Sequence, residues 1–141
     1  MWNLFGKTRK RATRERSDNR EKTGRRGERY AERYLKKKGY RLAERNLRRK
    51  AGEIDLVMWD GEDLVIVEVR TVHLHGEGPL EERIPYRKRR QLVRLARGLV
   101  AELPDPLPPV RFDLCVVILE PERRITHFRD AFTVDELNAE Q

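Results

Sequence analysis

The sequence predicts an α/β domain in which a mixed sheet of about five strands is flanked by helices. The first observation behind this prediction is the order of the expected elements along the chain: a helix, three strands, a helix and two further strands. The second is the strand expected at residues 110–119, which is apolar on both faces beyond Asp113 and is therefore typical of a central strand covered on two sides. A length of 141 residues suits one domain with a single core.

The front of the chain is strongly basic. Residues 1–50 hold 20 Lys and Arg against 6 Asp and Glu, whereas the remaining 91 residues hold 12 against 18, so the total of +8 combines charges of +14 and −6. Residues 1–22 have few apolar anchors, and we expect a flexible or partly helical basic arm there, followed by one domain over residues 23–141. The asymmetry predicts a polyanionic partner, nucleic acid first, although a solvated tail with no partner is the simpler alternative.

Composition excludes several classes of protein. No run approaches the roughly 18 consecutive apolar residues of a transmembrane helix, and the arm lacks the apolar face of an interfacial helix, so we expect no membrane partner. The apolar start of the chain is too short for a signal-peptide core. Cys115 is the single cysteine, which leaves no internal disulfide and no cysteine-based zinc site. We therefore expect a cytoplasmic protein.

A first helix is predicted from residue 23 to a basic last turn at residues 36–38, where Gly39 provides a stop. Its apolar residues recur at helical spacing; they are Tyr30, Ala31, Tyr34 and Leu35. Glu28 lies on or beside this apolar stripe. The sequence leaves two roles open for it, an ion pair with a nearby basic group or a place in a polar site.

Residues 40–49 are predicted to form the next strand. It ends in a basic cluster that leads directly into the following strand and that consists of Arg48, Arg49 and Lys50. Because this order places three cations at the lip of any site built from Asp55, we expect the cluster to contact a nucleic acid.

Residues 53–59 and 63–70 are predicted to form a hairpin. They flank Asp60-Gly61, a dipeptide expected to supply the positive-φ positions of a tight turn. Side chains two residues apart share a face of a strand. On the first strand, one face is expected to carry Glu53 and Asp55, and the other Ile54, Leu56 and Met58. On the second strand, one face is expected to carry Glu68 and Arg70, and the other Val65, Val67 and Val69.

The hairpin can bring Asp55 and Glu68 together against an otherwise apolar sheet. Burial of two carboxylates costs several kcal/mol unless a cation compensates for it. A divalent ion held by oxygen ligands is one such cation, and Arg70 is the other. The sequence therefore predicts either a site for Mg²⁺ or Mn²⁺ or an ion-paired sheet edge without function.

Pro85 suits the first turn of an amphipathic helix that extends to about residue 103. Lys88 continues the apolar stripe of this helix toward its start, so we expect its side chain to reach inward at the sheet edge. The outer surface of the helix is basic and is expected to contact a nucleic acid through Arg87, Arg89 and Arg90.

The remaining elements carry fewer functional signals. Residues 72–84 contain glycine and proline and are expected to form a loop. His73 and His75 in this loop could serve as ligands or as a general base, but histidines in such loops are more often ordinary polar residues. After the central strand, residues 125–129 are predicted to form a last strand. A short terminal helix is then expected to begin with Thr133 as its cap.

Four segments resemble a known family. They read GEIDLV at residues 52–57, VIVEVRT at 65–71, KRRQLVRLA at 88–96 and RFDLCVV at 111–117. In this order and spacing they resemble the YraN-like family of small bacterial proteins, over roughly residues 24–134. The resemblance implies the restriction-endonuclease-like fold, which Holliday-junction resolvases and tRNA-splicing endonucleases share, but it carries over no assigned activity.

The fold also implies candidate site residues. Members that cut nucleic acid use a Glu from the first helix, an Asp on the second strand and a Glu-x-Lys on the third; the matching positions are Glu28, Asp55, Glu68 and Arg70. The resemblance thus implies Mg²⁺ or Mn²⁺ held by Asp55 and Glu68. Arg70 departs from the family's usual Glu-Val-Lys, and an arginine does not lose its proton in a protein as a lysine can. Base chemistry would then fall to metal-bound water or to Lys88, while Arg70 would hold a phosphate.

Three functions are compatible with these observations. The first is Mg²⁺-dependent cleavage of phosphodiesters in DNA or RNA. The second is a nucleic-acid-binding module without cleavage, which Arg70 favours. The third is a protein-interaction domain whose carboxylates pair only with Arg70 and Arg111. A homodimer would accompany specificity for branched DNA.

Overall fold

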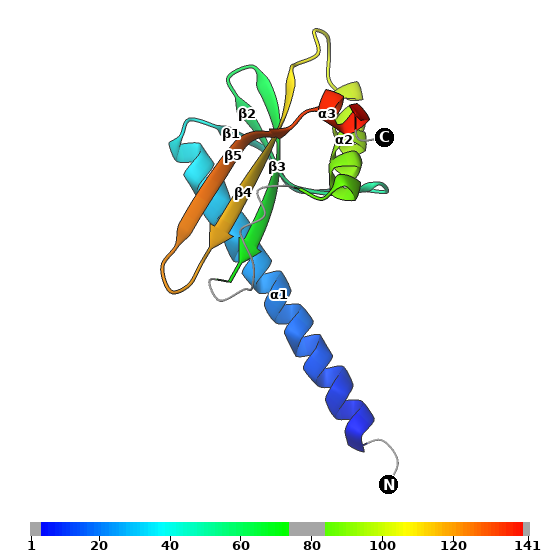
Figure 1. Cartoon of the computed structure of the whole chain (residues 1–141), viewed down its shortest axis with the longest axis vertical. Coiled ribbons are helices and arrows are strands. Elements are labelled where there is room, and N and C mark those ends of the chain that lie inside the picture. Colours follow the sequence, from blue (N-terminus) through cyan, green and yellow to red (C-terminus); the bar gives the residue numbers. More distant parts are fainter. Residues whose placement is uncertain (1–3, 74–83, 140–141) are drawn as a thin grey trace.

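The computed structural model describes residues 4–73 and 84–139, with side chains from Arg14 onward. One mixed sheet contains, in this order, β1 (Arg41–Arg49), β2 (Gly52–Asp60), β3 (Asp63–Val72), β4 (Val110–Ile118) and β5 (Arg124–Phe132). The helices are α1 (Leu4–Lys37), α2 (Tyr86–Ala101) and α3 (Val134–Ala139). α1 crosses one side of the sheet and projects well beyond it, whereas α2 and α3 lie together on the other side (Figure 1). The predicted fold class is confirmed, and this architecture is the one expected of the restriction-endonuclease-like fold.

α1 is anchored by the apolar stripe in its C-terminal half. Ala31 and Leu35 are fully buried, and Gly39, at φ +100°, lets the chain turn away from the helix. The helix predicted over residues 23–38 is part of this longer one, which includes most of the segment expected to be a basic arm. All side chains over residues 14–22 are exposed, so this part of α1 lies outside the core.

The pairing of the strands makes the sheet mixed. β1, β2 and β3 are antiparallel neighbours, β3 pairs with β4 in parallel, and β4 pairs with β5 antiparallel. α2 provides the crossover connection that a parallel pair requires. Residues 111–117 of β4 are all buried, which confirms the predicted central strand. Thr133 caps α3 as predicted, because its hydroxyl accepts a hydrogen bond of 3.2 Å from the N–H of Glu136, whose carboxylate accepts one of 3.1 Å in return.

The turn between β2 and β3 differs from the prediction. Asp60 is the last residue of β2 and pairs with Asp63, and of the expected Asp60-Gly61 dipeptide only Gly61 has a positive φ, at +60°. The expectation that Asp60 also supplies a positive φ is therefore wrong. A two-residue turn with Gly61 first and Glu62 second needs only the one positive value.

Two apolar cores cover opposite faces of the sheet. The core on the α1 side includes Leu56, Met58, Val65 and Val67, and the core on the α2 side includes Ile54, Val57, Leu64 and Ile66. The expectation that Ile54 shares a face with Leu56 and Met58 is therefore wrong. The alternation of β2 is interrupted at Asp55, whose neighbour on β1 is Asn46, and the φ of +47° at Asn46 departs from strand geometry.

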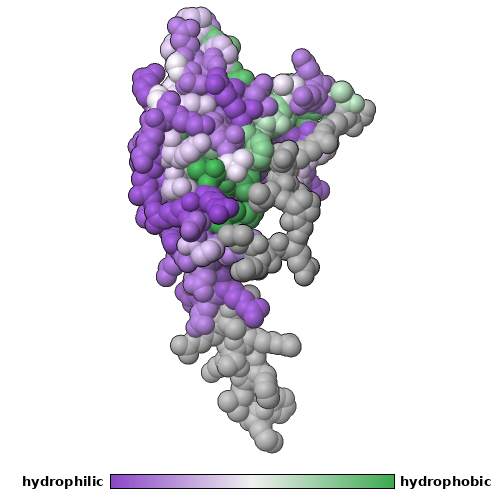
Figure 2. Space-filling model, turned by 60° about the vertical axis from the view of Figure 1, so that its left-hand side comes forward, coloured by the Kyte–Doolittle hydropathy of each residue, from purple (hydrophilic) through white to green (hydrophobic). Residues whose placement is uncertain are grey.

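Polar residues dominate the surface. Figure 2 shows hydrophilic side chains over most of the described face, with a small hydrophobic patch near its centre. In the ranges that the structure describes, no helix combines the length and the apolarity needed to cross a membrane. Cys115 is buried in the core on the α1 side, where burial raises the pKa of its thiol to about 12.

Candidate active site

The acidic pair expected from the hairpin lies where the ladder between β2 and β3 ends. The last paired residues there are Leu56 and Val67, so Asp55 and Glu68 follow on adjacent strands. Oδ2 of Asp55 accepts a hydrogen bond of 2.8 Å from the backbone N–H of Val69, which holds this carboxylate against β3. Burial raises the pKa of Asp55, and the hydrogen bond opposes the rise.

Glu68 has the less satisfied of the two carboxylates. Its Oε2 is buried and accepts no hydrogen bond from the part of the chain that the structure describes. Burial, followed by repulsion from Asp55, raises the pKa of Glu68 to about 7. Nζ of Lys88, on α2, lies 3.8 Å from this oxygen. Lys88 thus reaches the sheet edge and faces the acids.

Glu28 reaches the same acids from α1. Burial raises its pKa to about 7, and repulsion from Asp55 and Glu53 adds to the rise. The pKa values of Glu28 and Asp55 depend on each other, which indicates that the two carboxyl groups lie close together. With its nitrogen turned toward the acids, the Asn46 amide donates to Oε2 of Glu28 at 2.9 Å and to Oε1 of Glu53 at 3.2 Å. Asn46 therefore connects α1 to the edge formed by β1 and β2.

Gly27 sets the distance between α1 and the sheet. A Cβ at this position would lie 2.0 Å from Oγ1 of Thr71 on β3, so no larger residue allows the same approach. Because Glu28 is the next residue, this close contact determines how far its side chain extends toward Asp55.

Gly52 has the corresponding role for α2. Its φ is +141°, and a Cβ there would lie 2.2 Å from Nε2 of Gln91. This amide donates a hydrogen bond of 2.8 Å to the carbonyl of Ala51. The contact docks α2 against the turn between β1 and β2, one helical turn from Lys88.

The two arginines considered as partners of the acids have different positions. Arg70 is two residues beyond Glu68 on β3, and its charge opposes the rise in the pKa of Glu68 that burial causes, although less than the charge of Lys88 does. Arg111 lies elsewhere and makes ion pairs with Asp60, Asp63 and Asp113 at 2.9, 3.5 and 2.9 Å. The alternative in which Arg111 pairs with the carboxylates of the site is therefore wrong.

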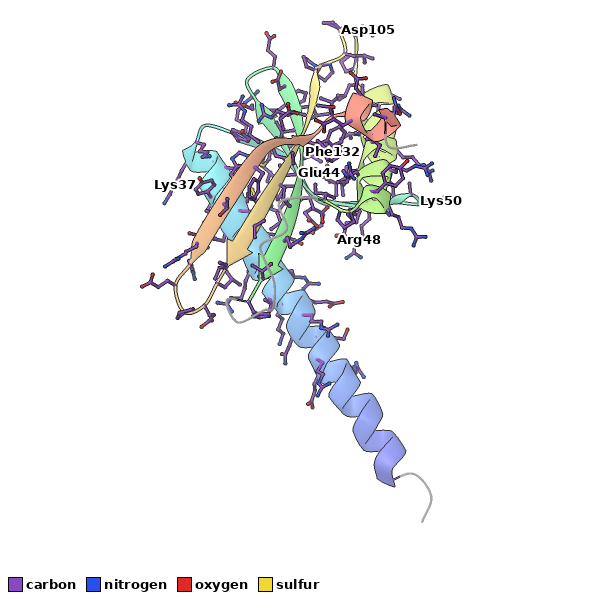
Figure 3. All side chains as sticks on the ribbon, viewed as in Figure 1. Lys37, Glu44, Arg48, Lys50, Asp105 and Phe132 are labelled. Carbon is purple, nitrogen blue, oxygen red and sulfur yellow. The ribbon has the colours of Figure 1, made fainter. Side chains whose placement is uncertain are left out.

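The basic cluster after β1 lies next to α2. Figure 3 places Arg48 and Lys50 beside this helix, at the turn between β1 and β2. Arg48 is 3.8 Å from Glu53, and Arg49 makes an ion pair of 3.2 Å with Glu102. All three basic side chains are exposed, so they remain accessible to a polyanion.

The basic residues of α2 do not all face outward. Arg87 and Arg90 are exposed, but Arg89 keeps only 4% of its surface exposed. The expectation that Arg89 lies on the outer surface is wrong, because it precedes Leu92 and Val93 by three and four residues. This spacing places it on the apolar face of the helix.

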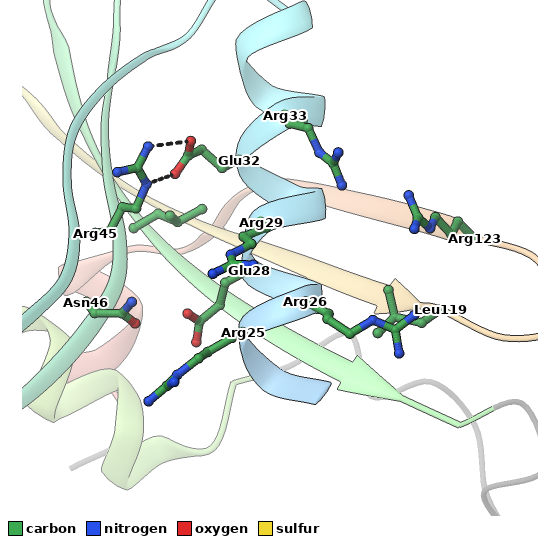
Figure 4. Close-up of a pocket in the computed structure, with 11 residues that line it drawn as sticks. Arg25, Arg26, Glu28, Arg29, Glu32, Arg33, Arg45, Asn46, Leu119 and Arg123 are labelled. Atoms are coloured by element: carbon green, nitrogen blue, oxygen red, sulfur yellow. Dashed lines mark hydrogen bonds and ion pairs between the residues drawn. The ribbon is translucent and has the colours of Figure 1, made fainter. Parts of the chain in front are cut away.

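Two hollows among the described residues flank the acids. The α2 hollow, of about 560 Å³, has a basic lining that includes Arg87, Lys88, Arg90 and Arg94. The α1 hollow, of about 550 Å³, is lined by Glu28, Asn46 and six arginines (Figure 4). His73 lines a smaller hollow on another side of Glu28, and His75 lies outside the described residues. Each hollow thus includes a residue that interacts with the acids, Glu28 in the α1 hollow and Lys88 in the α2 hollow.

The donor set suits an oxygen-preferring cation. Within residues 4–73 and 84–139, no group of three or more His, Cys, Asp or Glu side chains is arranged to hold a metal ion. Mg²⁺ does not require such a group, since it is usually bound through one or two carboxylates and keeps several waters. The buried Oε2 of Glu68 accepts no hydrogen bond from any described residue, so it is an atom that a cation would satisfy. Asp55 and Glu68 therefore fit Mg²⁺ or Mn²⁺.

Sequence reasoning assigned no role to Asn46 or Gln91. A signal existed for Asn46, because asparagine is one of the few residues that adopt positive φ readily and it interrupts a basic strand. No comparable signal marks Gln91, whose contact with Ala51 depends on how α2 docks.

Fold and site together define a class of protein: an α/β domain with a mixed five-stranded sheet, in which one hairpin carries a partly buried pair of acids close to residues that line two basic hollows. The family model of the uncharacterised protein family UPF0102 matches residues 27–117. The chain belongs to this family, which confirms its resemblance to the YraN-like proteins.

Curated relatives cover almost the whole domain. A UPF0102 protein of Solibacter usitatus is 42% identical over 114 residues, which is 79% of this chain and 86% of that protein. Relatives from Chlorobaculum tepidum and Persephonella marina are 38% and 37% identical, and each match covers 79% of this chain and 92% and 94% of the relative. The names of these proteins give the family and no activity.

Proposed function

We propose that this chain is a metal-dependent phosphodiesterase that acts on nucleic acid. The observation that carries the proposal is the position of the partly buried Asp55 and Glu68 on adjacent strands. Oε2 of Glu68 is buried, accepts no hydrogen bond from the described residues and lies 3.8 Å from Nζ of Lys88. One ammonium group leaves this pair of acids only partly compensated, because burial and mutual repulsion still raise the pKa of Glu68 to about 7. A divalent cation would complete the compensation.

Asp55 and Glu68 would hold the cation. A divalent ion bound there supplies positive charge that acidifies water and offsets the charge of a phosphate. The backbone N–H of Val69 keeps the Asp55 carboxylate in place through its hydrogen bond of 2.8 Å. Glu28 acts on the site through its electrostatic interaction with Asp55, so it is a positioning residue.

The cations around the acids suit a phosphate substrate. Lys88 faces Glu68 and lines the α2 hollow, so its ammonium group can contact both the acid and a phosphate. A lysine can also give up a proton in a suitable environment, whereas Arg70 keeps its charge. Arg70 therefore serves to hold negative charge on the phosphate.

The polymeric nature of the substrate is inferred from the distribution of charge. Residues 1–50 carry a net charge of +14. Arg48 and Lys50 are exposed after β1, and Arg87 and Arg90 are exposed in the hollow that Lys88 also lines. Neutralisation of many phosphates by such a surface releases counterions and favours nucleic acid over a small phosphate ester.

The test is cleavage of end-labelled DNA and RNA, single-stranded and duplex, in a titration with Mg²⁺ and Mn²⁺. We expect products that depend on the metal and that disappear with EDTA. Asp55→Asn should abolish them, while Asp105→Asn, the same change at an exposed position far from the acids, should not. Equal cleavage by the Asp55 variant and the parent would contradict the proposal.

A second candidate function is nucleic-acid binding without cleavage. Arg70 favours it, because arginine occupies the position where the fold's nucleases have lysine. In this case the parent binds labelled nucleic acid with a strong dependence on salt and yields no product with any metal. Gain of cleavage in Arg70→Lys would identify Arg70 as the cause.

A further inference from the structure

The α1 hollow contains an unusual number of arginines from distant parts of the chain. Four come from α1, one from β1 and one from the turn between β4 and β5; they are Arg25, Arg26, Arg29, Arg33, Arg45 and Arg123. A solvated helix face would present cations from one element only. Here three segments direct cations into one space.

The acidic residues of the hollow do not neutralise this charge. Glu32 keeps only 7% of its surface exposed and is fully engaged, since Arg45 binds both of its oxygens and Nζ of Lys36 lies 2.9 Å away. Glu28 is directed toward Asp55 and Asn46. The hollow therefore retains a net positive charge.

Three of the arginines have no acidic partner in the part of the chain that the structure describes. Arg29 and Arg33 are one helical turn apart and make no ion pair there, and Arg123 contacts only the ring of Tyr30, at 5.8 Å. Figure 4 shows Arg33 and Arg123 pointing toward each other across the hollow. Two guanidinium groups that face one space repel each other unless an anion lies between them, and phosphate is the anion that such groups bind in a bidentate manner.

We propose that the α1 hollow binds the phosphodiester backbone of a nucleic-acid strand, on the opposite side of the acids from α2. Glu28 lines this hollow and contacts Asp55, while Lys88 lines the α2 hollow and faces Glu68. A strand that crosses the acids therefore reaches both hollows, whereas a mononucleotide reaches one. The substrate is then a polymer held on both sides of the cleaved bond. This inference rests on the proposed function.

The test is the salt dependence of binding. Fluorescein-labelled single strands and duplexes of DNA and RNA are titrated in Ca²⁺, in place of Mg²⁺, over a series of potassium chloride concentrations. The double variant Arg29→Ala/Arg33→Ala removes two phosphate contacts and should bind more weakly. The slope of its log K against log salt should be less steep than that of the parent, by about 1.4 for a single strand and about 1.8 for a duplex. Both arginines are exposed on α1, and alanine has a high helix propensity, so the variant should fold.

Two further double variants show whether a change in the slope depends on where the arginines lie or only on the charge that is lost. Lys37→Gln/Arg41→Gln removes the same charge from two exposed residues that line neither hollow. Figure 3 shows Lys37 pointing away from the domain. The slope of this variant should match that of the parent. Arg29→Lys/Arg33→Lys should keep the slope of the parent. An unchanged slope in the alanine variant, with a parent that binds, overturns the inference and leaves the proposed function intact. A parent that binds none of the probes refutes the proposed function, and the inference falls with it.

Discussion

Nζ of Lys88 lies 3.8 Å from Oε2 of Glu68, an oxygen that is buried and accepts no hydrogen bond in the described ranges. The two residues come from different elements, α2 and β3. A lysine is thus present beside the acids although Arg70 occupies the third position of the Glu-Val-Arg segment. In the proposed cleavage, Lys88 would supply the ammonium group that β3 lacks.

Lys88→Gln tests this relationship. If the ammonium group acts on the phosphate or on the attacking water, its removal should lower the cleavage rate by about 10² or more. Glu68 would also lose a charge that opposes the rise in its pKa, so the acidic limb of the pH–rate profile should move to higher pH. Lys37→Gln provides the matched change at an exposed position. A Lys88 variant with the rate and pH profile of the parent would exclude this role.

The raised pKa values also predict how stability depends on pH when no divalent ion is present. Burial raises the pKa of Glu68 from an ordinary 4.5 to about 7, and Glu28 is raised to a similar value. The folded protein therefore holds protons that the unfolded chain has lost, and the free energy of unfolding should fall as the pH rises from about 4.5 to about 7. For the more buried Glu68 the fall is on the order of 2 kcal/mol. Urea unfolding at pH 5 and pH 8 in EDTA measures it.

Two comparisons separate this effect from a general influence of pH. Glu68→Gln should reduce the fall, because the amide does not ionise. Mn²⁺ added at pH 8 should stabilise the parent by RT ln(1 + [Mn²⁺]/Kd), about 2.7 kcal/mol at a hundredfold excess over Kd, and should have little effect on Asp55→Asn. Constant stability of the parent between pH 5 and pH 8 in EDTA would show that the acids are not buried together.

The convergence of Asp55 and Glu68 could be predicted from sequence because both lie on one hairpin, where register is a local property. The alternation expected for β2 failed at Asp55, where β1 departs from strand geometry at Asn46. The sequence predicted Arg89 on the outer surface because charged residues are rarely buried. Its spacing from Leu92, which places it on the apolar face of α2, was the better guide. The α1 hollow could not be predicted, because Arg123 meets the helix only after β4 and β5 have paired. Contacts of this kind depend on tertiary packing, and no sequence period encodes them.

Asp113 forms a second buried acid cluster, whose role we expect to be structural. Burial alone would raise the pKa of Asp113, but hydrogen bonds from His127 and Arg111 outweigh it and lower the pKa. The distances to these donors are 2.7 and 2.9 Å, and the backbone N–H of Asp130 donates at 3.0 Å. Its carboxylate is therefore saturated, in contrast to that of Glu68.

Asp113→Asn should lower the free energy of unfolding by about 3 kcal/mol, because it leaves the charge of the buried Arg111 with fewer acidic partners. Cleavage per folded molecule should stay unchanged. Urea unfolding and the cleavage assay measure the two effects, with Asp105→Asn as the exposed control. Loss of cleavage at full stability would instead assign Asp113 to the active site.

Gly27→Ala tests whether the close approach of α1 to β3 positions Glu28. The added Cβ would lie 2.0 Å from Oγ1 of Thr71, so the helix or the Thr71 side chain must shift, and we expect destabilisation by about 1–3 kcal/mol. A shift of about 1 Å at Glu28 should also reduce cleavage up to about 10²-fold. Gly24→Ala is the matched control on the same helix, because nothing lies within 4 Å of its added Cβ; it should stabilise the protein by about 0.5–1 kcal/mol. Thr71→Ala in the Gly27→Ala background removes the clashing oxygen and should restore part of both losses. Equal effects of the two glycine substitutions would show that Glu28 does not depend on this contact.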